Sequence, residues 1–149
     1  MPLVDVRVQA HDFDTGAELT RLEALGGGGV ASFTGVVRGG GGLAGLLLEH
    51  HPGMTQIAMT RIADDAAARW PLLGITVIHR YGLLPVGARI VFVGTASAHR
   101  TAALEACAFL IDWTKTRAPF WKQEQQGDGR RSWVEPRPED EDAAGRWTR

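Results

Sequence analysis

The sequence predicts an α+β fold in which about three helices pack on a mostly antiparallel sheet. One observation is the order of the segments: strand-like and helix-like patterns alternate as β-α-β-β-α-β-β-α-β-β. The other is composition. Of 149 residues, 44% are hydrophobic and 22% are charged, which is typical of one globular domain with a real core.

Composition also limits the classes of function. The net charge of -1 argues against a general electrostatic attraction to nucleic acid. The single cysteine, Cys107, excludes an intrachain disulfide and a thiolate metal cluster. The N-terminus lacks the apolar region of a signal peptide, and no apolar run reaches about 18 residues. We therefore expect a cytoplasmic protein that does not enter the membrane.

The N-terminal segments have clear patterns. Leu3–Gln9 alternates apolar and polar residues, which predicts a half-buried strand. Asp14 or Thr15 can cap a short helix with leucines at helical spacing, and the glycines at 26–29 end it.

The central segments predict two strands and a long helix. Val30–Arg38 is rich in β-branched residues, and Leu43–His50 reads as the next strand. The glycines at 39–42 between them predict a hairpin or a mobile loop. Gly53–Trp70 has apolar residues at helical spacing, and Pro71 ends that helix.

The C-terminal part predicts a second long helix between strands. Ser97 can cap a helix running from Ala98 to about Thr116, and Pro119 ends it. The strands expected around it, with a turn at Gly82–Gly87, are Ile75–Tyr81, Arg89–Thr95, Phe120–Glu124 and Ser132–Glu135. We expect one domain over residues 1–135, and a charged, loosely held tail over residues 136–149.

The segment Lys115–Lys122 (KTRAPFWK) mixes cations with large aromatics, which predicts the wall of an anion-binding pocket. On a helix, Lys115 lies about 20° from Ala108 and 40° from Ile111. It therefore continues the predicted buried stripe of Leu104, Cys107, Ala108 and Ile111, where a lysine must pair, snorkel or line a cavity. The alternative is a solvated last-turn lysine favoured by the helix dipole.

Lys122 falls on the following strand and shares a face with Phe120. Alone it would be an ordinary surface lysine. Beside Lys115 its pKa would be depressed, which suits a base or nucleophile near neutral pH.

Other cations lie elsewhere. His99 and Arg100 open the second long helix, where backbone N–H groups favour an anion, although a solvated first turn is equally compatible. About 18 helical residues span roughly 27 Å, so Arg100 and Lys115 of one chain cannot line one small pocket unless the helix breaks. Otherwise the pocket is shared between subunits. Arg38, at a strand end, is a further candidate or a surface arginine.

The remaining candidates favour structural roles. His50 and His51 are adjacent on a strand and face opposite ways, so a metal site there is not favoured. His79 reads as a hydrogen-bonded structural histidine and Cys107 as a packing residue.

These residues resemble the large, catalytic subunit of molybdopterin synthase, the MoaE family. The matching stretches are Ser32–Arg38 (SFTGVVR), Leu48–Met54 (LEHHPGM), Val77–Arg80 (VIHR), Ile90–Gly94 (IVFVG), Ser97–Arg100 (SAHR) and Lys115–Lys122 (KTRAPFWK).

The resemblance implies an α/β hammerhead-type fold and a homodimer. Each large subunit would bind a small ubiquitin-like sulfur carrier, giving a heterotetramer. The carrier's Gly-Gly thiocarboxylate would enter the pocket and supply two sulfurs to cyclic pyranopterin monophosphate, making the molybdopterin dithiolene. No metal or other cofactor is implied for this step.

The resemblance also assigns residues. Lys115 is implied as the essential lysine and Lys122 as the second active-site lysine. The other residues it places at or beside the substrate are Val36, Val37, Arg38, His99, Arg100, Gln123, Glu124 and Arg137. Family members usually have polar residues after the position of Arg38. Here four glycines follow, which puts side-chain contacts at that loop in question.

Two other functions stay open on the residues alone. The cations could serve a non-catalytic module that binds a phosphorylated ligand or RNA, against which the net charge argues. The chain could also be a structural subunit that has lost its site, against which the lysine pair argues.

Overall fold

The computed structural model describes residues 1–135 and 137–148. The larger of its two sheets has the strand order β1-β4-β6-β2. β4 pairs with β6 and β6 with β2 in antiparallel fashion, whereas β1 joins β4 in parallel. The strands are β1 (Leu3–Gln9), β2 (Gly29–Val36), β4 (Leu72–Arg80) and β6 (Arg89–Ser97).

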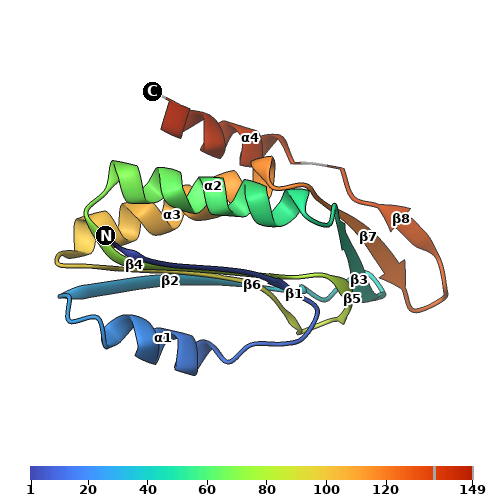
Figure 1. Cartoon of the computed structure of the whole chain (residues 1–149). Helices are drawn as coiled ribbons and strands as arrows, with labels where there is room; N and C mark the ends of the chain where they lie inside the picture. Colours follow the sequence, from blue (N-terminus) through green and yellow to red (C-terminus); the bar gives the residue numbers. More distant parts are fainter. Residues whose placement is uncertain (136, 149) are drawn as a thin grey trace.

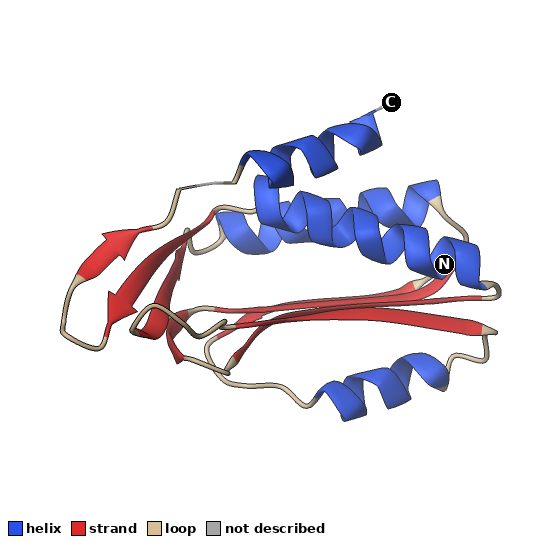
Figure 2. Cartoon of the chain, turned by 180° about the vertical axis from the view of Figure 1, so that it is seen from behind, coloured by secondary structure: helices blue, strands red, loops and turns tan. Residues whose placement is uncertain are grey.

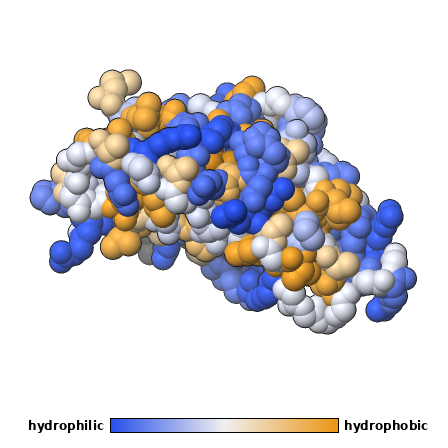
Figure 3. All heavy atoms as spheres, turned by 90° about the horizontal axis from the view of Figure 1, so that it is seen from below, coloured by the Kyte–Doolittle hydropathy of each residue, from blue (hydrophilic) through white to orange (hydrophobic). Residues whose placement is uncertain are grey.

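A smaller antiparallel sheet, of order β5-β3-β7-β8, lies at one end of the larger one (Figure 1). It leaves Leu83, Trp121 and Trp133 exposed. Apolar surface is visible at this end of the molecule (Figure 3). The strands are β3 (Leu43–His50), β5 (Gly82–Pro85), β7 (Phe120–Gln126) and β8 (Arg131–Trp133).

Helices cover both faces of the larger sheet (Figure 2). One face carries α1 (Thr15–Glu23), and the other carries α2 (Met54–Arg69) and α3 (Arg100–Arg117). A fourth helix, α4 (Pro138–Gly145), lies along α3 and is followed by the 3-10 turn η1 (Arg146–Thr148). None of the helices in the described ranges is long and apolar enough to cross a membrane.

The strand alternation sorts side chains into two cores. Ile75 and Val77 of β4 are buried in the core that α2 and α3 cover, while Ile78 faces the α1 side with Phe92. His79 follows the Ile75–Val77 face, since side chains two apart on a strand point the same way. This places a histidine where the α2–α3 core reaches the smaller sheet.

Most predicted elements are confirmed, including the Asp14 cap of α1, whose carboxylate accepts a hydrogen bond from the Ala17 N–H at 3.2 Å. The hairpin at Gly39–Gly42 is wrong. β2 pairs with β6 and β3 pairs with β5 and β7, so this loop crosses from one sheet to the other. The predicted turn at Gly82–Gly87 contains β5, because strand pairing with β3 overrides the local turn pattern.

The cap of α3 is also corrected. Ser97 ends β6, and its hydroxyl donates a hydrogen bond to the Pro71 carbonyl at 3.0 Å. His99 is the N-cap instead, with extended backbone angles and no side-chain capping bond. Pairing of β6 as far as Ser97 therefore delays the start of the helix by two residues.

Residues 138–148 of the tail form α4 and η1, contrary to the prediction of a loosely held segment, and they raise the number of described helices from three to four. Trp147 packs edge-on against Trp70 and Phe109, and its indole N–H donates to the Asp112 carboxylate at 2.7 Å. Arg146 also pairs with Asp112, at 2.9 Å. Aromatic anchors in a charged segment outweigh its polar composition. The domain division at residue 135 stays a prediction.

Candidate functional site

The chain contains only two lysines, Lys115 and Lys122, and the fold brings them together. Lys115 lies in the last turn of α3, and Lys122 lies near the start of β7. The chain leaves α3 at Ala118 in an extended conformation and enters β7 at Phe120. This short connection keeps both cations at the junction of the two sheets.

The electrostatics of Lys122 reflect this proximity. Lys122 is exposed as a residue, but neighbouring protein atoms desolvate its ammonium, and this burial lowers its pKa. The positive charge of Lys115 lowers it further, and Arg137 acts in the same direction. Asp140 and Glu124 oppose them. Lys122 is therefore more readily deprotonated than an ordinary lysine.

Lys115 does not continue the buried face of α3, so that prediction is wrong. The residue is exposed, and the face toward the sheet runs through Ala103, Ala106, Leu110 and Thr114. The stripe from Leu104 to Ile111 lies to one side of that face, because neighbouring helical residues differ by about 100°. Leu104 is 59% exposed.

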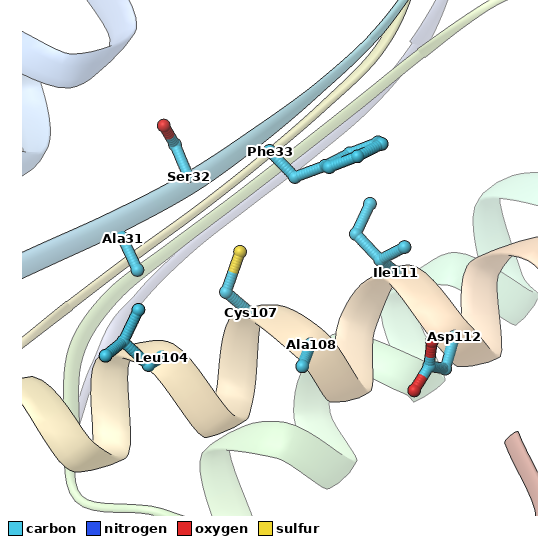
Figure 4. A pocket seen from close by; sticks show the side chains of 8 residues that line it. All are labelled: Ala31, Ser32, Phe33, Leu104, Cys107, Ala108, Ile111 and Asp112. Atoms are coloured by element: carbon cyan, nitrogen blue, oxygen red, sulfur yellow. The ribbon is translucent and has the colours of Figure 1, made fainter. Parts of the chain in front are cut away.

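The apolar stripe that was predicted to be buried lines an open groove instead. Leu104, Cys107, Ala108 and Ile111 of α3 form one wall of a cavity of about 360 Å³, and Ala31, Ser32 and Phe33 of β2 form the other. The side chains of Leu104, Cys107 and Ile111 point toward the strand, and Phe33 extends toward Ile111 (Figure 4). Burial raises the pKa of Cys107 to about 11, so its thiol stays protonated, in agreement with the packing role predicted for it.

A layer of rings lies close to the lysine pair. The imidazole of His79, on β4, stacks on Phe120 of β7, with centroids 3.6 Å apart and planes inclined by 17°. His50 of β3 contacts Tyr81 at 4.5 Å and Phe120 at 6.0 Å between centroids. Its Nδ1 lies 3.1 Å from the Thr55 hydroxyl. These rings join the two sheets close to Lys122, whose charge acts on His79.

His79 is held neutral in this layer. It is only 9% exposed, and burial lowers its pKa to about 4. Its Nδ1 lies 2.8 Å from the Arg80 carbonyl, and this hydrogen bond works in the opposite direction. The charges of Lys122, His50 and Lys115 lower the pKa further. This agrees with the predicted hydrogen-bonded histidine, and it places the residue in the site as well.

The other predicted residues divide by location. Arg38 is exposed just beyond β2, two residues after Val36, which is also exposed. Val37 is buried, and its backbone N–H donates to the Ala88 carbonyl at 2.9 Å. Its side chain thus serves packing. Phe33 of β2 lines the groove beside Ile111, so the end of β2 that bears Arg38 lies toward the Lys115 end of α3.

Gln123, Glu124 and Arg137 lie beside the lysines. On β7, Glu124 shares the Lys122 face, whereas Gln123 lies on the other face opposite Trp133. Arg137 precedes α4 and forms an exposed ion pair with Glu139 at 3.5 Å.

His99 and Arg100 are not brought to the lysines within one chain. α3 is a continuous helix from Arg100 to Arg117, so Arg100 lies about 22 Å along the axis from Lys115. The start of α3 sits against the start of β2, where a Cβ on Gly29 would lie 3.2 Å from the Arg100 Cα. The two candidate cation groups therefore occupy opposite ends of the groove.

Comparison with known proteins identifies the family. The family model described as "MoaE protein" matches residues 8–117. A molybdopterin synthase catalytic subunit of Pseudomonas aeruginosa is 52% identical over 147 residues, covering 95% of this chain and 97% of its own. A solved molybdopterin biosynthesis MoaE protein of Burkholderia ambifaria has a TM-score of 0.83 at 40% identity, and 99% of each chain is covered.

The chain belongs to the MoaE family.

This assignment confirms the resemblance found in the sequence. A solved molybdopterin synthase of Staphylococcus aureus has the same fold at 26% identity, with a TM-score of 0.78 over 86% of this chain and 95% of its own. The α+β class with mostly antiparallel strands is thus the fold of the MoaE proteins.

In this MoaE chain, His79 lies close to the lysine pair, although its sequence pattern predicted only a structural role. The sequence shows only that the residue lies in an apolar strand. Neither this pattern nor the pairing of that strand with β6 reveals that an aromatic ring from β7 stacks on it. Its position two residues after Val77 on the core face was the available signal.

In residues 1–135 and 137–148, no three His, Cys, Asp or Glu side chains cluster as metal ligands.

Proposed function

We propose that this chain is the catalytic subunit of a molybdopterin synthase. It transfers sulfur from the thiocarboxylated C-terminus of a small carrier protein to cyclic pyranopterin monophosphate, making the molybdopterin dithiolene. The observation that carries the proposal is the cluster of Lys115 and Lys122 at the sheet junction, with Arg137 beside it. The names of close relatives support the same reaction.

The chemistry fits a cationic site. The pterin carries a phosphate, and the carrier ends in a thiocarboxylate, so two anions must approach each other. Lys115, Lys122 and Arg38 offset this repulsion by charge-assisted hydrogen bonds. Arg137 adds a further positive charge next to Lys122.

The reaction needs proton transfer as well as charge. Attack by the thiocarboxylate sulfur on a side-chain carbon of the pterin forms a C–S bond and breaks a C–O bond at that carbon. The displaced oxygen takes up a proton and leaves as water or as a freed phosphate oxygen, and the carrier stays attached as a thioester. Water then cleaves the acyl–sulfur bond, which releases the carrier as a carboxylate and leaves the sulfur on the pterin. Lys122, with its lowered pKa, is suited to shuttle these protons or to form a transient acyl adduct.

The function requires a partner. The relatives are named catalytic subunits, which implies at least one further subunit. For this chain we propose a small ubiquitin-like carrier with a Gly-Gly C-terminus, whose extended tail reaches the lysines. The location we propose is the cytoplasm.

A second copy of the chain would complete the site. β2 is the last strand of the larger sheet in the described residues, and Phe33 and Val36 are exposed on it. A two-fold axis across two antiparallel β2 strands would bring the Gly29 end of one chain to the Val36 end of the other. His99 and Arg100 would then lie near the partner's Arg38 and Lys115, so we propose a homodimer and, with two carriers, a heterotetramer.

Reconstitution tests the proposed function. The purified chain is mixed with cyclic pyranopterin monophosphate and a carrier that ends in Gly-Gly thiocarboxylate. Dithiolene formation is followed by oxidative conversion of the product to a fluorescent pterin. We expect product with this carrier and none with the same carrier ending in a carboxylate. A stable complex with no product from the thiocarboxylate carrier would overturn the proposal.

A further inference from the structure

One polar atom near the lysine pair has no role in the function proposed above: Nε2 of His79. Its Nδ1 faces the Arg80 carbonyl at 2.8 Å, which requires the proton to be on Nδ1 because a carbonyl can only accept. Nε2 therefore carries a lone pair. Nothing in the described part of the chain donates a hydrogen bond to it.

This lone pair is not sealed in the core. Among described residues, the fully enclosed side-chain polar atom without a partner is the Thr114 hydroxyl, and His79 is not in that class. The Nε2 edge therefore remains accessible at the sheet junction. The stack on Phe120 and the bond to Arg80 together fix the plane and rotation of the ring.

Lys122 is the donor whose charge acts most strongly on His79. Phe120 and Lys122 are two residues apart on β7 and share one face, about 7 Å apart along the strand. A lysine has a flexible four-carbon stem and three N–H donors, so its ammonium can fold back over the Phe120 ring to the imidazole edge. Its ammonium forms no ion pair with any described residue.

We propose that His79 is a positioning residue: its Nε2 accepts a hydrogen bond from the Lys122 ammonium and holds that amine at the sheet junction. A neutral imidazole can do this without adding another cation to the site. Burial keeps His79 neutral at physiological pH, because it lowers the pKa of the imidazole. The inference rests on the proposed function only in taking Lys122 as a working residue.

The surrounding charges set the background for any titration. The groups that act on Lys122 or His79 come from α3, β3, β7 and the segment from residue 137 into α4. They are Lys115, His50, Glu124, Arg137 and Asp140. A hydrogen bond to the charged amine favours its protonated form, so removing the acceptor should lower the pKa of Lys122 further.

The lysine content allows a direct test without carrier or pterin. Reductive methylation with ¹³C-formaldehyde labels the N-terminus and both lysines. In a Lys115→Arg background, which keeps the charge, the side-chain dimethylamine signal belongs to Lys122. Its NMR titration is compared with and without His79→Phe, which keeps a ring against Phe120 and removes the lone pair.

We expect His79→Phe to lower the pKa of Lys122 by about one unit. A merely structural His79 would change the melting temperature and leave that pKa in place, and such a result would overturn the proposal. His79→Gln retains an acceptor and should restore part of the shift.

A second measurement needs no change at His79. With ¹⁵N-histidine labelling, the Nε2 resonance reports whether its lone pair accepts a hydrogen bond. Lys122→Met should move it toward the value of a free lone pair, and an unmoved resonance would overturn the proposal. If both NMR results are as expected but the chain makes no dithiolene, only the proposed function is contradicted.

Discussion

The imidazole of His79 stacks on the ring of Phe120, with centroids 3.6 Å apart. The contact joins β4 of the larger sheet to β7 of the smaller one, and Lys122 follows two residues later on β7. The second lysine therefore follows closely on a contact that ties its strand to the other sheet.

Stability should depend on pH through His79. Its pKa is about 4 in the folded chain, against an ordinary value of 6.5 once the chain unfolds, so the unfolded chain binds more protons between these values. The free energy of unfolding should then rise with pH across this window, by about 3 kcal/mol at most, and level off above it. Urea denaturation at a series of pH values measures this slope.

Two variants make that measurement specific. His79→Phe should flatten the slope between about pH 4 and 6.5. His51→Gln alters an exposed histidine and should preserve it. An undiminished slope in His79→Phe would show that other groups produce the pH dependence.

Thr114→Val should stabilise the fold. The Thr114 hydroxyl is enclosed without a hydrogen-bond partner among the described residues, whereas valine has the same shape and no polar atom to desolvate. We expect the free energy of unfolding to rise by about 1 kcal/mol. Thr95→Val is the matched control, since its hydroxyl donates to the Ala103 carbonyl at 2.6 Å, and it should lower that free energy. Equal losses in both would contradict the account.

Trp147→Ala should destabilise the chain through the tail. Trp147 contacts Trp70 and Phe109 and donates to Asp112. We expect a loss of about 2–3 kcal/mol in the free energy of unfolding, less than for a fully buried tryptophan. Trp133→Ala removes a tryptophan that is 54% exposed and should cost about 0.5 kcal/mol or less. A Trp147→Ala variant as stable as Trp133→Ala would show that Trp147 does not anchor the tail to α3.

The sequence predicted what depends on local pattern. Alternation in Leu3–Gln9, the Asp14 cap and the helical spacing of Met54–Arg69 all act within a few residues, and each element formed as expected. The pairing partners of Leu43–His50 are separated from it by up to about 80 residues of chain, so the hairpin expected from adjacency was wrong.

The site was predictable in its members and less so in its arrangement. Lys115 and Lys122 are close in sequence, and a short connection keeps them close in space. The exposure of Lys115 depends on which side of α3 meets the sheet. The large apolar residues Leu104 and Ile111 led to the wrong side being predicted, because they face a groove at β2 and not the centre of the sheet.

Mixed dimers should test whether the site is shared between two copies. Arg100→Ala and Lys115→Ala chains, each of which we expect to be inactive on its own, are co-expressed with different tags and purified through both. A shared site predicts recovered activity, because one of the two sites in a mixed dimer keeps both Arg100 and Lys115. A site built within one chain predicts no recovery, since both sites would then be defective.

Sulfur transfer at the lysine pair is tested most directly by mass spectrometry of the carrier together with the yield of dithiolene. Lys115→Ala should keep carrier binding and fold, yet slow conversion of the thiocarboxylate to a carboxylate by at least about 100-fold. Arg117→Ala, which removes an exposed cation from the same turn, should leave the rate near that of the unaltered chain. Full-rate sulfur transfer by Lys115→Ala would contradict the account.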